Sequence, residues 1–258
     1  MQQNPEFLAD RILHALSAPD RTAPPSEAVV GLSISAAYDI ARRVRAGLGR
    51  RRVGRKVGFT NRSLWERYNV DRPIWGEVYD EGLFTPDNPI PLAPYMEPRI
   101  EPEIVLGLAR APEPGMDRAA LRDCIDWVAP GFEIVQSIYQ GWSFTVADTI
   151  AAQGLHGALV LGERQRATAE MLDGLPSVPL DLTRDGAHVE NGIGANALGG
   201  PVSVLAHLVD VLGDKDALEG GELVTTGTLT DAWSVQPGEI WTARYGGVIG
   251  QGLEVRFV

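Results

Sequence analysis

The stretch Ile100-Glu101-Pro102-Glu103-Ile104-Val105-Leu106 places two acidic residues inside an aliphatic run. Because side chains alternate between the two faces of a β-strand, Glu101 and Glu103 are expected on one face and most of the aliphatic side chains on the other. Two carboxylates about 7 Å apart on a half-buried surface repel each other and lose hydration, and a bound cation relieves both costs. The stretch therefore predicts a buried strand with an acidic site on one face.

A third carboxylate, Glu133, interrupts a second apolar stretch, Gly131-Phe132-Glu133-Ile134-Val135. Three carboxylates with no thiolate nearby make a hard, oxygen-rich site, which suits Mg²⁺ or Mn²⁺. The chain has 34 acidic residues in 258, so acidic pairs also arise by chance and an exposed strand face is the alternative. The aliphatic flanks favour the metal site, because surface acids usually have polar neighbours.

Composition narrows the classes of partner. With 44% hydrophobic residues, the chain can bury a full core. The net charge of −11 argues against a nucleic-acid surface or an anionic membrane as partner, since both require a basic stripe. The single cysteine, Cys124, excludes an internal disulfide and a multi-thiolate zinc site. No apolar run approaches the roughly 18 residues of a membrane span, and no basic and apolar leader begins the chain, so we expect a cytoplasmic protein.

Residues 1–50 have the periodicity of helices. Phe7 and Ile12 belong to one amphipathic segment, which a Pro-rich turn follows. Ser33 or Ser35 can cap a second helix, because a serine side chain accepts a hydrogen bond from a free backbone N–H of the first turn.

From residue 51 onward, short β-like runs lie between Gly, Pro, Asn and Asp clusters, with helices near 117–125 and 202–212. Residues 184–186, Arg-Asp-Gly, are expected to form a hairpin turn. We therefore expect an α+β protein with one domain over residues 1–258. Its N-terminal helices are expected to pack on a curled, mixed or antiparallel sheet. That sheet belongs to the β-rich metal-binding core of residues 51–258. The expected strands are 53–59, 75–79, 99–108, 127–136, 156–161, 178–183, 187–190, 222–228, 239–245 and 252–258.

Lysine is rare in this chain, which uses arginine for nearly every cation, and one of the two lysines is Lys56. Strand alternation places Gly54 and Gly58 on the same face as Lys56, where they leave room for a ligand. A compact, titratable ammonium group is then a candidate for catalysis. The alternative is a strand lysine whose stem is buried and whose ammonium reaches solvent.

Two further elements are candidates for a pocket. His156 begins an apolar strand and is the one histidine expected there as a polar group. Thr226-Gly227-Thr228 closes the strand that begins at Glu222, and its glycine can expose backbone N–H groups to an anion. The alternative for the tripeptide is an ordinary turn.

Five segments, taken in order, resemble the 2-oxo-4-pentenoate hydratase and 4-oxalocrotonate decarboxylase family of the fumarylacetoacetate hydrolase superfamily. They are residues 54–60, 98–104, 132–135, 226–228 and 237–250. The resemblance covers the chain from about residue 30 to its end. It implies a β-roll like the C-terminal part of fumarylacetoacetate hydrolase.

The resemblance also implies roles for individual residues. It implies that Glu101, Glu103 and Glu133 bind Mg²⁺ or Mn²⁺ and that Lys56 is catalytic. It implies, by position, a catalytic role for Asp80. Lys56 can offset the negative charge of a substrate, or can move a proton if burial and the metal lower its pKa.

The substrate side is less similar to the family. Thr226, Gly227 and Thr228 match its substrate-side loop. Where relatives tend to read Asp-Asn after Asp-Thr-x-Ala, this chain has Ala152-Gln153 and gains a histidine shortly after. We therefore expect Gln153 to contact substrate and His156 to be catalytic.

The implied activity is that of a metal-dependent lyase that acts on a small 2-oxo acid, and a hydratase of the 2-oxo-4-pentenoate type is favoured. Decarboxylation of the 4-oxalocrotonate type uses the same stabilisation of an enolate and is the alternative. A hydrolase or tautomerase of the wider superfamily would use the same three carboxylates. The non-enzymatic alternative is a protein that binds metal and a 2-oxo acid. The resemblance implies a homo-oligomer.

Overall fold

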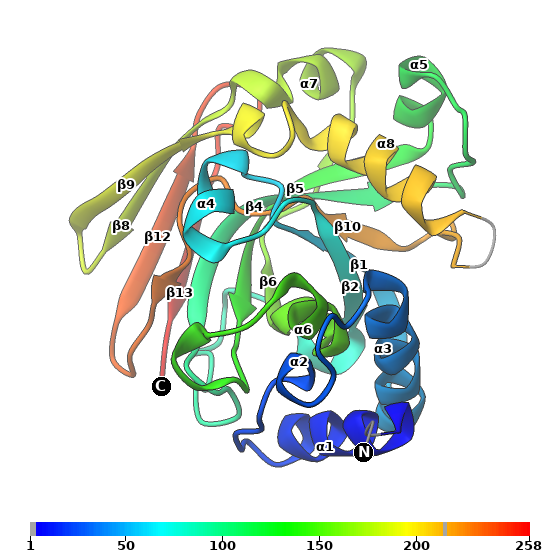
Figure 1. The fold of residues 1–258 in the computed structure, drawn as a ribbon. Coiled ribbons are helices and arrows are strands. Elements are labelled where there is room, and N and C mark those ends of the chain that lie inside the picture. Colours follow the sequence, from blue (N-terminus) through cyan, green and yellow to red (C-terminus); the bar gives the residue numbers. More distant parts are fainter. Residues whose placement is uncertain (1–3, 214–215) are drawn as a thin grey trace.

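The computed structural model describes residues 4–213 and 216–258. Two β-sheets and a group of helices form an α+β fold, which confirms the expected class (Figure 1). The larger, nine-stranded sheet has the order β2-β1-β10-β4-β5-β6-β3, with β11 beside β4 and β7 beside β5. Its strands are β1 (Arg52–Gly58), β2 (Ile74–Tyr79), β3 (Leu83–Phe84), β4 (Arg99–Leu108), β5 (Ile125–Val135), β6 (His156–Leu161), β7 (Gln165–Arg166), β10 (Leu223–Thr225) and β11 (Trp233–Ser234).

The smaller sheet has four strands in the order β13-β12-β8-β9, and all of its pairs are antiparallel. The larger sheet is mixed, because β1 pairs with β10 and β3 with β6 in parallel. Asp185 and Gly186, both at positive φ, turn the chain from β8 into β9, as the sequence predicts for residues 184–186. The strands are β8 (Pro179–Arg184), β9 (Ala187–Ile193), β12 (Ile240–Tyr245) and β13 (Gly252–Arg256).

The main hydrophobic core joins both sheets to the helix α8 (Pro201–Leu212). Ile104 of β4, Leu208 of α8 and Trp241 of β12 are all fully buried in it. This core covers the aliphatic face of β4, so its acidic face is turned the other way. The alternation read from the sequence is therefore the alternation in the structure.

One helical stretch, Gly194–Leu212, is long and apolar enough to cross a membrane by length and composition. The expectation that no apolar run approaches this length was therefore wrong. Half of the stretch is buried inside the fold, and α8 supplies Leu205 and Leu208 to the main core. A helix that is apolar on most sides is also typical of a protein interior.

The N-terminal helices gather around one end of the larger sheet (Figure 1). They are α1 (Pro5–Ser17), α2 (Pro25–Ala28) and α3 (Ile34–Leu48), and Ser33 caps α3 by accepting the N–H of Ala36. Ile12 of α1 is buried, but Phe7 is 50% exposed, because the buried face of α1 is centred on Leu8. These helices pack on the segment that carries Leu155, next to the site described below.

Other helices are short and connect the strands. The predicted helix near 117–125 ends early, because β5 already begins at Ile125. The predicted strand 222–228 also ends early, and after Thr225 the chain turns through Gly227 at a φ of 90°. The helices are α4 (Trp65–Tyr68), α5 (Arg118–Arg122), α6 (Val146–Ala151) and α7 (Ala169–Gly174).

Candidate metal centre and active site

Three glutamates converge where β4 pairs with β5. Glu101 stands directly opposite Glu133 in the antiparallel ladder, and Glu103 follows two positions along β4. One oxygen from each carboxylate lies within 4.8 Å of the other two. Glu103 and Glu133 are fully buried, whereas Glu101 is partly exposed. The geometry is that of a site for one small cation.

Each fully buried carboxylate keeps one oxygen without a protein partner. The backbone N–H of Gly227 donates to Oε2 of Glu103 at 2.7 Å, and Oε1 has no partner among the described residues. Oε1 of Glu133 lies 3.3 Å from Nζ of Lys56 and 2.8 Å from Nδ1 of His156, and Oε2 has no such partner. A buried carboxylate oxygen without a hydrogen bond is costly, so this arrangement fits a metal ligand.

The cluster changes the pKa values of its members. Burial raises the pKa of Glu101 to about 7, although Lys56 opposes the shift. Burial and the charges of Glu133 and Glu101 raise the pKa of Glu103 well above its usual range. For Glu133, burial acts in the same direction, but Lys56 and His156 outweigh it and its pKa is lowered. Without a cation, the three carboxylates therefore cannot all ionise easily at neutral pH.

Lys56 lies on β1 and is 2% exposed. Burial lowers the pKa of Lys56, but Glu133, Glu101 and Glu103 outweigh burial, and the net pKa is raised. Gly58 makes room for the ammonium, since a Cβ at this position would lie 3.3 Å from Nζ. Gly54 has a different role: its Cβ would lie 2.1 Å from the carbonyl oxygen of Leu223, so this glycine lets β10 approach β1.

The cluster opens into a narrow cavity of about 40 Å³, here called the Lys56 cavity. Its walls are mostly apolar, with polar groups from Asn61, Tyr68 and Thr228 beside Lys56 and Glu101. The remaining lining residues are Gly58, Phe59, Leu64, Ile74, Val135, Trp142, Gly154, Leu155 and Ala232. The lining offers positive charge and polar groups near the cluster and apolar side chains elsewhere, which suits a small acid with an apolar tail.

The substrate-side loop has a more structural role than its match to the family implies. The hydroxyl of Thr226 donates to the carbonyl oxygen of Ile104, and its side chain is fully buried. Gly227 uses its N–H on Glu103, and a Cβ there would collide with Thr60 at 1.8 Å. Of the three residues, only Thr228 lines the Lys56 cavity.

Three other expected site residues lie away from the Lys56 cavity. Asp80 accepts from Nε of Arg51 at 2.8 Å, on the surface. Gln153 donates to the carbonyl oxygen of Ala41 and accepts from the hydroxyl of Tyr79, so its amide fastens α3 to β2. His156 contacts Glu133 but lines a separate cavity. The expectations of a substrate contact for Gln153 and of catalysis by Asp80 have no geometric support, because their polar groups are engaged elsewhere.

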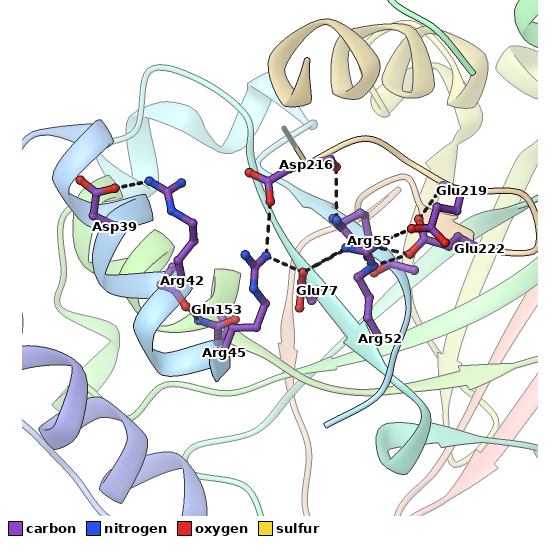
Figure 2. A network of polar contacts seen from close by, with 12 residues as sticks. Asp39, Arg42, Arg45, Arg52, Arg55, Glu77, Gln153, Asp216, Glu219 and Glu222 are labelled. Atoms are coloured by element: carbon purple, nitrogen blue, oxygen red, sulfur yellow. Dashed lines mark hydrogen bonds and ion pairs between the residues drawn. The ribbon is translucent and has the colours of Figure 1, made fainter. Parts of the chain in front are cut away.

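Sequence reasoning missed a buried ionic network directly beside Lys56. Figure 2 shows Arg55 between Glu77 and Glu222, with Arg45 beyond Glu77 and Arg52 next to Glu222. Nη1 of Arg55 lies 3.7 Å from Glu77 and 3.4 Å from Glu222, and the arginine is fully buried. Alternation placed this arginine on the apolar face of its strand, which was the available signal.

A second missed residue is Tyr245 of β12. Its hydroxyl lies 2.9 Å from the carbonyl oxygen of Glu103 and 3.1 Å from that of Gly131. It therefore joins the smaller sheet to both strands that carry the carboxylates. Nothing in the local sequence around Tyr245 indicates this contact, which depends on the packing of the two sheets.

The family model described as fumarylacetoacetate (FAA) hydrolase C-terminal matches residues 44–253, a range that includes the three glutamates and Lys56. The chain belongs to this family. A 2-keto-4-pentenoate hydratase from Paraburkholderia xenovorans (strain LB400) is 32% identical over 254 residues, which cover 95% of this chain and 93% of the relative. A 4-oxalocrotonate decarboxylase from Pseudomonas sp is 30% identical over 200 residues, or 77% of this chain and 76% of the relative.

A solved structure extends the similarity to the whole fold of this FAA hydrolase family member. The 4-oxalocrotonate decarboxylase from Pseudomonas putida G7, complexed with magnesium and adipate, superposes with a TM-score of 0.90 at 26% identity. The match covers 98% of this chain and 97% of the decarboxylase. Together the comparisons confirm the family and the fold that the sequence segments implied.

Proposed function

We propose that this chain is a divalent-metal-dependent lyase that hydrates a 2-hydroxy-2,4-dienoic acid of the 2-oxo-4-pentenoate type. The observation that carries the proposal is the cluster of three carboxylates beside Lys56, of which Glu101 reaches the wall of the same cavity as the lysine. The 32% identity to a 2-keto-4-pentenoate hydratase over 95% of the chain supports the reaction class.

Glu101, Glu103 and Glu133 would hold the cation, and the unpartnered oxygens of Glu103 and Glu133 fit that role. An all-oxygen set favours Mg²⁺ or Mn²⁺, and the solved decarboxylase was complexed with magnesium. A cation held there would supply Lewis-acid stabilisation of the negative charge that develops on a 2-oxo acid.

Lys56 supplies positive charge at this site. Its raised pKa keeps the side chain an ammonium in the free protein, so the lowered pKa that proton abstraction by Lys56 would require is not present there. The ammonium can therefore offset the negative charge of a bound substrate, or donate a proton to it, rather than accept one. An acidic protein needs such a local cation, because its net charge of −11 repels an anionic substrate at long range.

Addition of water at the far end of the diene requires a polar group at that end of the cavity. Gln153 and His156, the two expected site residues of this segment, line the other cavity instead. The polar side chains that line the Lys56 cavity are Asn61, Tyr68 and Thr228. The hydroxyls of Tyr68 and Thr228 already donate to other groups of the protein, so toward a water they can only accept. We assign the positioning of the attacking water to this group.

Decarboxylation of a 4-oxalocrotonate-type acid is the second candidate. The TM-score of 0.90 to a 4-oxalocrotonate decarboxylase favours it. The apolar wall formed by Trp142 and Leu155 also favours this reaction. A carboxylate loses its charge when it leaves as CO₂, and apolar surroundings favour that loss of charge. The same carboxylate cluster and Lys56 would serve this reaction.

A hydrolase or tautomerase needs a histidine or an acid that activates water beside the cluster. His156 touches Glu133, but its other ring nitrogen is turned away from the Lys56 cavity, so we rank this class lower. A protein that only binds a 2-oxo acid would show no turnover at all. We further infer a homo-oligomer in a reducing cytoplasm, which the free thiol of Cys124 suits.

The experiment is turnover of 2-hydroxypenta-2,4-dienoate by the purified protein with Mg²⁺. Formation of a 4-hydroxy-2-oxo acid that stops when the metal is chelated supports the proposal. Binding of the acid without any product would reject the lyase and support a protein that only binds the acid.

A further inference from the structure

A second cavity of about 250 Å³ lies on the other side of the segment 153–157 from the Lys56 cavity. It is enclosed by the ends of β2 and α3, by β3 and by the loop that carries Tyr95. No lining residue is common to the two cavities. Gln153 and His156 face this second cavity, whereas Gly154 and Leu155 face the Lys56 cavity, a reversal that accompanies positive φ values at residues 153–155.

His156 forms the inner end of the second cavity and is 7% exposed. Its Nδ1 lies 2.8 Å from Glu133, and a carboxylate only accepts, so Nδ1 carries the proton. In the neutral ring Nε2 is then an acceptor, and it has no partner among the described residues. It faces Gly82, where a Cβ would lie 4.0 Å from it. The inner end therefore suits an O–H donor.

The body and the mouth of the cavity have different chemistry. The body is lined by Phe84, Tyr95 and two prolines, and also by the polar side chains of Tyr79, Gln136 and Gln153. At the mouth stands Arg50, whose Nε lies 3.0 Å from a carboxylate oxygen of Glu81. Glu81 is itself 63% exposed and can turn outward into water. The mouth thus offers a guanidinium to an anion.

We propose that this second cavity is a binding site for a small aromatic acid that carries a hydroxyl group, with the hydroxyl donating to Nε2 of His156 and the carboxylate at Arg50. A ring can pack on the aromatic and proline side chains of the body, with the acceptor of His156 and the guanidinium of Arg50 both on the cavity wall. Through His156 the site has a direct hydrogen-bonded connection to Glu133, which belongs to the carboxylate cluster.

Calorimetric titration with 4-hydroxybenzoate tests the proposal, with benzoate and phenol as probes that each lack one end. Saturating Mg²⁺ and oxalate are present throughout, so that the Lys56 cavity is blocked to carboxylates. We expect 4-hydroxybenzoate to bind about tenfold more tightly than either truncated probe, since each loses one hydrogen-bonded contact. Retention of this order in Lys56→Met would separate the site from the proposed active site.

Two variants address the two ends independently. Gly82→Ala adds a methyl group in front of Nε2. It should therefore lower the affinity for 4-hydroxybenzoate to that for benzoate and leave the affinity for benzoate unchanged. Arg50→Gln should weaken both acids and leave phenol unchanged. The matched control is Arg51→Gln, because Arg51 is the neighbouring arginine, pairs with Asp80 and does not line the cavity.

Equal affinities for the three probes in the parent protein would overturn the proposal, and so would no binding of 4-hydroxybenzoate up to on the order of 10 mM. The comparison of probes uses the parent protein alone, so it holds even if a variant fails to fold. Competition between 4-hydroxybenzoate and oxalate would also overturn it, by placing the acid in the Lys56 cavity.

Discussion

Glu101 and Glu133 stand directly opposite each other in the ladder between β4 and β5. Like charges at such a position destabilise a sheet, and both residues lie in a largely buried cluster. The raised pKa of Glu101, about 7, shows how the free protein reduces this cost, because a proton takes the place of a cation. Because of this pairing, binding of a cation is coupled to release of a proton.

Cation binding should depend on pH with a defined sign. Between the usual pKa of 4.5 and about 7, free Glu101 keeps a proton that a cation must displace. Mg²⁺ affinity should therefore rise as pH increases through 7 and fall as pH decreases. Calorimetry in two buffers with different ionisation enthalpies should show release of at least one proton per cation at pH 6, because Glu103 also has a raised pKa. Identical heats in the two buffers would contradict this prediction.

Lys56→Met should reduce turnover by well over tenfold, a barrier increase above about 1.4 kcal/mol, because the cavity loses the ammonium of Lys56. Lys56 also contacts Glu133, so the variant needs a separate check of its fold by circular dichroism. Arg51→Met removes an exposed cation and serves as the control. Full activity of Lys56→Met would make this lysine a structural residue.

The ionic network in Figure 2 should contribute to stability. Arg55→Met should lower the free energy of unfolding by about 3 kcal/mol, because Glu77 and Glu222 lose a buried cation. Urea denaturation measures the change. The exposed pair of Arg51 and Asp80 gives the comparison, since Arg51→Met should cost less than about 1 kcal/mol. Equal losses in the two variants would show that the network is no stronger than a surface pair.

Hydration and decarboxylation can be separated with two substrates. The protein with Mg²⁺ is incubated with 2-hydroxypenta-2,4-dienoate and, separately, with 2-oxohex-3-enedioate. We expect a 4-hydroxy-2-oxo acid from the first and no carbon dioxide from the second. Carbon dioxide from the second, with no product from the first, would establish the decarboxylase as the correct candidate.

The position of the attacking water can be tested within the hydratase proposal. Thr228→Val keeps the shape of the side chain but removes the hydroxyl from the Lys56 cavity. It also removes the hydrogen bonds of this hydroxyl with the backbone of Thr230, so circular dichroism must first show a native fold. We expect kcat to fall by about tenfold or more with little change in KM, because the loss affects the transition state more than substrate binding. An unchanged kcat would remove Thr228 from the group that positions water. Thr183→Val, in the smaller sheet, is the control.

The sequence was sufficient for features that depend on local alternation. The two faces of β4, the placement of Glu101 and Glu103 on one of them, and the hairpin at residues 184–186 follow from a period of two and from turn chemistry. The approach of Glu133 depends on the register of β5 against β4, which no local period gives. Its apolar flank and the match to the family indicated that it belongs to the site.

The sequence was misleading where the backbone leaves its regular path. Gln153 and Leu155 have positive φ, so the directions of the side chains in this segment follow neither a helical nor a strand period. His156 therefore faces the second cavity. Arg55 is buried on an apolar face, because Glu77 stands opposite it on β2. Such cross-strand partners become visible only once the strands are paired.

The central claim is that the three carboxylates bind one divalent cation, and calorimetric titration of Glu103→Gln with Mg²⁺ tests it most directly. A glutamine keeps an oxygen for the N–H of Gly227 but removes one charge from the cluster, so the fold should persist. We expect one site in the parent protein and a loss of affinity of at least about a hundredfold in the variant, with an exposed control, Glu170→Gln, unchanged. Parent-like Mg²⁺ binding by Glu103→Gln would contradict the account.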